Sequence, residues 1–252
     1  MADLTGVRIS TEWLRRLERA EDELKPECSS CPVLSGALFR RFSMEQISRF
    51  TCIFRPARYR RNQVLFFEGG AAQHLFALRS GLVKMVKPLA NGKERIVRVI
   101  LPGEIFGLEA LNEAHYPLTA VVLQGSEICS IGRDEFFVFL RANPDIALEM
   151  VLVLAGEIAA LGAQMTSLSF KDARTRLATF LLSLVPLGQA LSSGKCSLTL
   201  ALSSQEIAEV LELSSETISR TWRRLEREGL LEKHGRQVVI QNLPALESSA
   251  RG

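Results

Sequence analysis

A carboxylate and a guanidinium stand four residues apart near the C-terminus, at Glu216 and Arg220. Residues with this spacing share one face of a helix, so both side chains reach the same surface. A carboxylate accepts a hydrogen bond from N4 of cytosine, and a guanidinium donates two to O6 and N7 of guanine. The pair therefore suits the reading of base edges. It is equally an ordinary ion pair on a solvated helix face.

The residues around this pair predict two short helices joined by a tight turn. Ser203 followed by Glu206 forms a capping box for the first helix, and Ser214 can cap the second. The apolar residues of the second helix recur at spacings of four and three, at Ile218, Trp222 and Leu225. This pattern predicts a helix-turn-helix, whose second helix enters the major groove of DNA. A helical hairpin with capped ends would have the same spacing.

Two further features favour DNA over a plain helical hairpin. The polar side of the second helix is rich in arginine and serine: Ser215, Glu216, Ser219, Arg220, Arg223, Arg224 and Arg227. After Gly229, residues 232–240 predict a short β-hairpin that turns at Gly235. A helix-turn-helix followed by a hairpin is a winged helix.

Composition sets outer limits on the class of protein. The chain has 252 residues and a net charge of only +3, so bulk charge gives no argument for nucleic acid. No apolar run of 18 residues and no leading signal peptide is visible, which predicts a soluble, cytoplasmic protein without a membrane partner. Five cysteines, an odd number, favour reduced thiols or a metal site over a disulfide framework.

The middle of the chain predicts an all-β barrel or sandwich. From about Arg55 to Ile131, short apolar runs alternate with glycine-bearing segments about ten residues apart, which predict turns. These segments are Glu68-Gly69-Gly70, Ser80-Gly81, Asn91-Gly92, Pro102-Gly103-Glu104, Gly107 and Gly125. Asn91-Gly92 is the strongest hairpin signal among them.

A long helix is predicted from Asn143, a candidate cap, to about Leu168, with Pro144 at its first position. Its apolar residues alternate at spacings of four and three: Ala147, Val151, Leu154, Ile158, Leu161, Met165 and Leu168. Such a seam is typical of a two-stranded coiled coil. The alternative is one broad face packed on the barrel, which Met150, Leu152 and Val153 would serve. We expect both faces to be used, and a standing homodimer, because no charge interrupts the seam.

A β-barrel, an apolar helix and a winged helix, in this order, resemble the cyclic-AMP receptor and fumarate-nitrate regulator (CRP/FNR) superfamily of bacterial transcription factors, over residues 28–240. The most specific matches are Glu216-Thr217-Ile218-Ser219-Arg220, Leu65-Phe66-Phe67-Glu68-Gly69-Gly70, Arg79-Ser80-Gly81, Pro102-Gly103-Glu104 and Asn143-Pro144-Asp145. The resemblance implies an α+β fold in four parts. These are an N-terminal helix and Cys-x-x-Cys segment (1–40), a cyclic-nucleotide-binding-like β-roll (41–142), a dimerisation helix (143–170) and a winged helix-turn-helix (171–252).

The Glu-x-x-Ser-Arg pattern resembles the FNR branch, which implies a palindromic operator in double-stranded DNA with TTGAT-like half-sites. Glu216, Ser219 and Arg220 would then read bases, and Thr217 would contact a phosphate. The full predicted DNA-contacting set is Ser204, Ser214, Ser215, Glu216, Thr217, Ser219, Arg220 and Arg223. RNA polymerase is an implied partner. No nucleophile elbow or Walker-type loop is visible, so we predict no enzyme and no catalytic residue.

The sequence departs from the family where its cyclic-nucleotide binders hold their ligand. Leu108 stands where those proteins have the glutamate that holds the ribose. The stretch that should hold the arginine-serine pair for the phosphate begins at Tyr116, and no arginine lies between Arg98 and Arg133. A buried phosphate without its cation would be costly. We therefore expect no binding of cyclic AMP.

The oxygen-sensing branch binds an iron–sulfur cluster through four cysteines, and this chain offers Cys28, Cys31 and Cys129 as metal ligands. Ala37 stands where the other cysteine is expected; Cys52 or Glu27 would have to complete the set. An oxygen- or redox-gated iron–sulfur regulator therefore stays an alternative, beside a decayed site or a Cys-x-x-Cys redox pair. From another class, a non-catalytic ligand-binding or scaffold protein also remains open.

Overall fold

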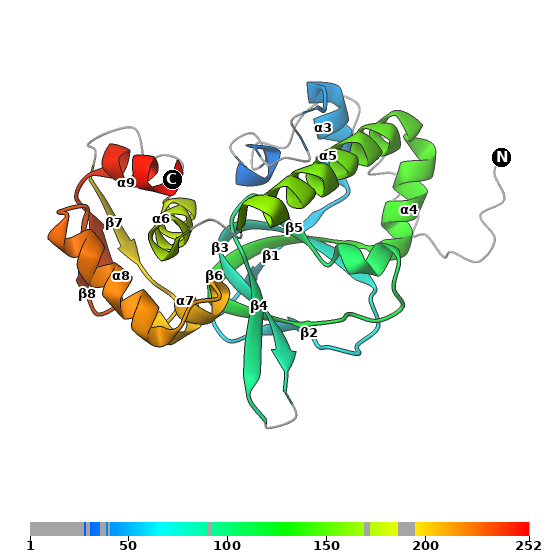
Figure 1. Cartoon of the computed structure of the whole chain (residues 1–252). Helices are drawn as coiled ribbons and strands as arrows, with labels where there is room; N and C mark the ends of the chain where they lie inside the picture. The colour runs from blue at the N-terminus through cyan, green and yellow to red at the C-terminus, as the bar shows by residue number, and fades with distance from the viewer. Residues whose placement is uncertain are drawn as a thin grey trace. The chain divides into compact units, whose positions relative to one another are not determined.

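The computed structural model describes residues 28, 31–35, 39, 41–89, 92–168, 172–185 and 195–251, without the side chains at 157, 160–168 and 251. The described residues fall into two compact units (Figure 1). The first unit runs to Lys87 and resumes at Ile100–Leu161, and the second holds Pro88–Val99 and the residues from Gly162 onward.

An antiparallel sheet dominates the N-terminal half, as the glycine-punctuated apolar runs predict. Its strands are β1 (Arg55–Tyr59), β2 (Val64–Phe66), β3 (His74–Pro88), β4 (Glu94–Ile100), β5 (Ile105–Phe106) and β6 (Thr119–Gly132). The order is β1-β6-β3-β4, with β2 paired to β6 and β5 paired to β3. Gly92 has a φ of 76° in the turn between β3 and β4, so the hairpin predicted there is confirmed.

Two of the predicted turns are wrong, because Ser80-Gly81 lies inside β3 and Gly125 lies inside β6. The pairing register of the two strands shifts here, from Ser80 opposite Glu127 to Leu82 opposite Gln124. Gly81 has a φ of +91°, and a Cβ added to it would lie 2.6 Å from the carbonyl oxygen of Gly125. Glycine is needed for this β-bulge, and in sequence a bulge glycine resembles a turn glycine.

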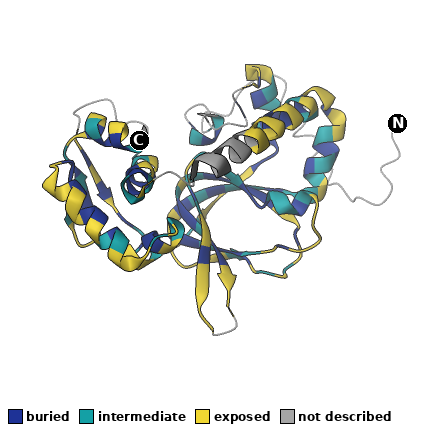
Figure 2. Ribbon diagram, viewed as in Figure 1, coloured by how far each residue is buried: buried dark blue, intermediate teal, exposed yellow. Residues whose placement is uncertain are grey.

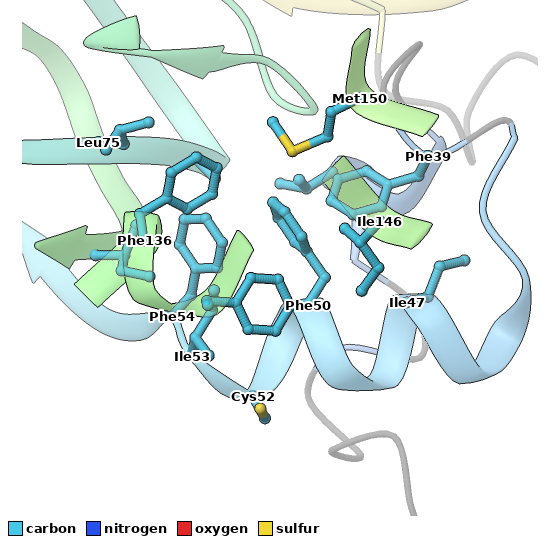
Figure 3. Packing of buried hydrophobic residues seen from close by; sticks show 14 of the residues in the cluster. Phe39, Ile47, Phe50, Cys52, Ile53, Phe54, Leu75, Phe136, Ile146 and Met150 are labelled. Carbon is cyan, nitrogen blue, oxygen red and sulfur yellow. The ribbon is translucent and has the colours of Figure 1, made fainter. Parts of the chain in front are cut away.

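The helices of the first unit pack together with the sheet through a cluster of buried phenylalanines (Figure 3). They are α3 (Met44–Cys52), α4 (Arg133–Ala142) and α5 (Pro144–Leu168), with short 3-10 turns η2 (Pro32–Ser35) and η4 (Leu108–Leu111). Phe50 of α3 lies at the centre, and its ring meets those of Phe39, Phe42, Phe136 and Phe139 edge to face at 5.2–5.9 Å and 6.0 Å. Leu75, Ile146 and Met150 join the same cluster, so it packs α3 and the first turns of α5 on the sheet.

Helix α5 starts at Pro144, as predicted, and buries one face while it exposes another (Figure 2). Met150 and Val153 are buried as expected, but Leu152 is 43% exposed, so its assignment to the packed face is wrong. At 3.6 residues per turn, Leu152 lies about a third of a turn from the line through Met150 and Val153. On a helix that is apolar on several sides, periodicity alone cannot identify the packed side.

The predicted seam lies partly on the exposed face of α5. Val151, Leu154 and Ile158 are 61%, 38% and 70% exposed, although all three are apolar. Leu161, Met165 and Leu168 lie in the same helix, but their side chains are outside the described part of the chain. The first unit therefore presents an uncovered apolar strip.

The second unit is a small helical domain with a three-stranded sheet in the order β7-β9-β8. Its elements are α6 (Ala173–Ser183), β7 (Cys196–Thr199), α7 (Ser204–Val210), α8 (Ser215–Arg227), β8 (Leu231–His234), β9 (Gln237–Ile240) and α9 (Leu243–Arg251). The hairpin predicted around Gly235 is confirmed as β8 and β9. The sequence did not predict α9, which packs against α6.

Candidate nucleic-acid interface

Local hydrogen bonds fix the start and the end of α7. The Ser203 hydroxyl accepts from the Glu206 N–H at 3.2 Å, and the Glu206 carboxylate accepts from the Ser203 N–H at 2.8 Å, so the predicted capping box is confirmed. At the other end, the Leu213 N–H donates to the Ala208 carbonyl at 2.9 Å. Glu212 takes a left-handed φ of 53° between them. This tight turn leads the chain directly into α8.

Helix α8 begins where its cap predicts. The Ser214 hydroxyl accepts from the Thr217 N–H at 3.1 Å and lies 2.8 Å from the Thr217 hydroxyl. Ile218, Trp222 and Leu225 are buried, which confirms the predicted apolar face. The opposite face is therefore free for polar side chains.

The predicted base-reading pair projects from that opposite face. Glu216 Oε1 and Arg220 Nη1 are 4.0 Å apart, and the two side chains are 81% and 68% exposed. An exposed pair at this separation is weak, so both side chains can exchange their contact for a ligand at little cost. Both readings of the pair, ion pair and base reader, fit this geometry.

The other predicted contacts surround the same surface. Ser204 is the exposed first residue of α7, Ser215 and Arg223 are exposed on α8, and Ser219 is half-buried. Together with Gln205, Trp222 and Lys233, they line a groove between α7, α8 and β8. A second hollow is lined by Arg220, Arg223, Glu226 and Arg227.

Sequence analysis missed Lys233 as a member of this surface. Its Nζ lies 5.6 Å from the centroid of the Trp222 ring, a cation–π distance that holds the ammonium beside α8. The predicted hairpin contains Lys233, but only the packing of β8 against α8 brings its side chain to this surface. Arg224, by contrast, does not line this groove, and its Nε donates to the Glu228 carboxylate at 3.0 Å.

The three candidate metal ligands line the same cavity of the structure. Cys28, Cys31 and Cys129 line one cavity of about 40 Å³ beneath β3 and β6, and Arg79 lies among them. Burial alone would lower the pKa of Arg79, but its hydrogen bond with Cys31 and its electrostatic interactions with Cys129, Cys31 and Glu127 outweigh burial and raise it. Sequence analysis missed Arg79, because only the β3–β6 pairing brings it to the cysteines.

The described lining of this cavity does not by itself complete an iron–sulfur site. Such clusters need four protein ligands, whereas the described lining residues supply three thiols and a guanidinium, in a space that holds a few water molecules. Across the described ranges, no three acidic, histidine or cysteine side chains are grouped closely enough to hold a metal ion. Ala37 and Glu27 lie outside the described residues.

Cys52 does not approach the other thiols as a replacement ligand. Its Sγ donates to the Arg49 carbonyl at 3.0 Å, and the side chain is buried and points away from Phe50 (Figure 3). Thr51 and Phe54, its neighbours, line the cavity instead. Cys52 is a core thiol.

Aromatic rings fill the interior of the β-roll near Tyr116. Phe66 stacks on Tyr116 with ring centroids 3.8 Å apart, and Phe76 stacks on Phe106 at 5.2 Å. The Tyr116 hydroxyl donates to the His74 carbonyl at 2.7 Å and accepts from the His74 N–H at 3.0 Å. Burial is the main reason why the pKa of Tyr116 is raised. This region is a packed core.

None of the helices in the described ranges has the length and apolar content needed to cross a bilayer. The family of cyclic nucleotide-binding domains matches residues 56–143, and the family of Crp-like helix-turn-helix domains matches residues 175–249.

Named relatives come from both branches of one family. The chain is 30% identical to the transcriptional activator protein FnrA of Stutzerimonas stutzeri over 229 residues, 89% of this chain and 93% of that protein. It is 27% identical to the cyclic AMP receptor protein of Thermus thermophilus over 216 residues, 85% of this chain and 97% of that protein.

The solved structure of FixK2 from Bradyrhizobium japonicum is similar too, with a TM-score of 0.62 and 27% identity over 78% of this chain and 96% of that one. These relatives are regulators rather than enzymes. The winged helix, the β-roll and these likenesses agree: the chain belongs to the CRP/FNR superfamily of DNA-binding transcription regulators.

Proposed function

We propose that this regulator acts in the cytoplasm as a homodimer that reads an inverted repeat with TTGAT-like half-sites, independently of cyclic AMP and together with RNA polymerase. The observation that carries the operator assignment is the exposed pair of Glu216 and Arg220 on the first turns of α8. One carboxylate and one guanidinium at this position match the cytosine donor and the guanine acceptors of the single G·C pair in a TTGAT half-site.

The exposed strip of α5 supports the homodimer. Val151, Leu154 and Ile158 follow the spacing of a coiled-coil seam, and all three face solvent in the single chain. Monomers rarely leave such a strip uncovered. Two copies related by a two-fold axis would cover it and place two winged helices on two half-sites about one helical turn apart.

The filled β-roll supports independence from cyclic AMP. Tyr116 begins the stretch that should hold the arginine-serine pair for the phosphate, and its ring is stacked on Phe66 instead. Leu108 provides no carboxylate for the ribose. A nucleotide would therefore have to displace packed aromatic rings and bury its phosphate without a cation there.

The test is binding of the full chain to a TTGAT inverted repeat, a repeat with one half-site scrambled, and a fully scrambled duplex. We expect sequence-selective binding by a dimer, unchanged by added cyclic AMP. Arg220→Ala should weaken binding to the repeat by about 1–3 kcal/mol and relax selectivity at one base pair. Equal binding to all three duplexes would refute the operator assignment and favour the non-catalytic scaffold alternative.

A second candidate concerns the signal: oxygen- or redox-gated control through Cys28, Cys31 and Cys129. The shared cavity favours it, because residues from distant parts of the chain converge there. The test is anaerobic purification with an absorption spectrum and an iron count, followed by operator binding before and after exposure to air. A brown, iron-loaded dimer that releases the operator in air would support an iron–sulfur sensor with a fourth ligand outside the described residues.

The other outcomes of that experiment separate the remaining readings. Loss of operator binding in an iron-free protein, reversed by a thiol reductant, would support a redox pair of cysteines. A colourless protein that binds equally well in air and after reduction would mean that these cysteines do not gate DNA binding.

A further inference from the structure

Helix α6 contacts the chain on both sides of α8. It lies in the second unit, begins at its cap Asp172 and packs against α8 and α9. Two of its arginines contact the two ends of α8. Arg176 contacts the turn before it, and Arg174 contacts the residue that ends it. Neither arginine belongs to the predicted DNA-contacting set.

The first contact holds the turn of the helix-turn-helix. Arg176 Nη1 donates to the Leu211 carbonyl at 3.0 Å. Leu211 is the C-cap of α7, a position whose carbonyl has no partner within the helix. The next residue, Glu212, has a left-handed φ, and α8 starts three residues later at Ser215. The guanidinium thus fixes the backbone from which α8 departs.

The second contact holds the far end of α8. Glu228, its C-cap, accepts from Arg174 Nη2 at 2.7 Å and from Arg224 Nε at 3.0 Å. Burial alone would raise the pKa of Glu228, but the hydrogen bonds and charges of Arg224 and Arg174 lower it. The carboxylate therefore stays ionised and links α6 to the last turn of α8.

We propose that Arg176 is a positioning residue for DNA binding, which sets the direction of α8 by holding the turn before it, with Glu228 as the weaker second fixation point. The proposal rests on the proposed operator reading by α8. Arg176 is half-buried and already donates to a backbone carbonyl, so it acts through α8 and not through a phosphate.

The main test compares Arg176→Ala, Arg176→Lys and the control Thr179→Ala in the full chain, at a temperature where all variants are folded. Thr179 is an exposed residue of the same helix. We expect Arg176→Ala to bind the operator about tenfold more weakly, as the loss of one charge-assisted hydrogen bond suggests. Lysine should restore most of the affinity, because it can still donate to Leu211, and Thr179→Ala should change nothing.

Salt dependence separates positioning from a phosphate contact. Loss of one phosphate contact lowers the slope of log K against log salt by about 1. We expect Arg176→Ala to keep the slope of the parent, whereas Arg223→Ala should lower it. A reduced slope for Arg176→Ala, affinity within about twofold of the parent, or no rescue by lysine would overturn the proposal.

Hydrogen exchange tests the contact without DNA. We expect Arg176→Ala to raise amide exchange at Leu213 by about threefold or more, with little change at Trp222 and Leu225. Unchanged exchange would overturn the proposal even if affinity fell. If the parent shows no selective DNA binding, the operator assignment fails, and the exchange data still decide whether Arg176 holds the turn. Glu228→Gln should weaken binding less, about threefold, because a partly exposed ion pair contributes little.

Discussion

Helices α5 and α8 each bury one face in their own unit and expose the other, but the exposed faces differ in chemistry. That of α8 carries Glu216, Arg220 and Arg223, whereas that of α5 carries Val151, Leu154 and Ile158. A polar, cationic face suits a hydrated polyanion with base edges, and an apolar strip suits another apolar helix. The difference indicates that the composition of an exposed face selects its partner, and under the proposed homodimer similar burial patterns would serve unlike partners.

The largest effect is expected when a charged residue is placed in the apolar strip of α5, because the strip would then no longer suit an apolar partner. Ile158→Glu should abolish the proposed dimer at micromolar concentration, a loss of more than about a hundredfold in dimer affinity, because it would bury an unpaired carboxylate. The measurement is sedimentation equilibrium. Val97→Glu, at an exposed apolar residue of β4, is the control and should leave the dimer intact. A dimer that survives Ile158→Glu would place the interface elsewhere.

The buried faces should respond alike although the exposed faces differ. Met150→Ala in α5 and Leu225→Ala in α8 remove side chains that are 5% and 0% exposed. Each should lower the free energy of unfolding by about 2–5 kcal/mol through lost burial and a residual cavity. Urea titrations followed by circular dichroism measure this. A cost below about 1 kcal/mol at either site would mean that its packing is looser than the structure indicates.

The cap of α8 should have a smaller effect. Ser214→Ala removes the acceptor of the Thr217 N–H and should cost about 1 kcal/mol of stability, within a range of 0.5–2. Ser214→Asn keeps a capping acceptor and should lose much less. If alanine and asparagine cost the same, the hydroxyl serves something other than the cap.

The N-terminal turn of α5 should give the smallest effect, visible in the pH dependence of stability. The hydrogen bond from Gln46, with the contacts of Arg49, holds the pKa of Asp145 below its ordinary value, although burial opposes this. A carboxyl group whose pKa is lowered in the folded state stabilises the fold at pH values above its unfolded-state pKa. This contribution is lost as pH falls through the folded-state pKa.

Asp145→Asn should therefore lose less stability than the parent between neutral pH and about pH 3, by under about 1 kcal/mol for a solvent-screened pair. Unfolding curves at several pH values measure the difference. Identical pH profiles would mean that Asp145 contributes nothing to acid stability.

Local signals in the sequence predicted local structure well. The caps at Ser203 and Ser214, the start of α5 at Pro144 and the hairpin at Gly235 each depend on residues within a few positions of one another. Errors arose where long-range packing decides. The bulge at Gly81 needs β6 beside it, and the exposure of Leu152 depends on which side of α5 meets the phenylalanine cluster.

The candidate sites follow the same division. The exposed face of α8 could be predicted from one helix, but Lys233 enters the groove only through the position of β8. The three cysteines could be named from a family resemblance. The position of Arg79 beside them depends on the pairing of β3 with β6. The exclusion of Cys52 from that cavity depends on how α3 packs, and the spacing of residues in the sequence reveals neither.

The uncovered strip of α5 has a consequence for gene dosage. Under the proposed homodimer, the amount of dimer at low expression rises with the square of the amount of chain, because two copies must meet. Promoter response would then be steeper than for a monomeric regulator. A twofold change in synthesis or proteolysis would change the occupied fraction of a weak operator by about fourfold, so that abundance itself becomes a threshold signal.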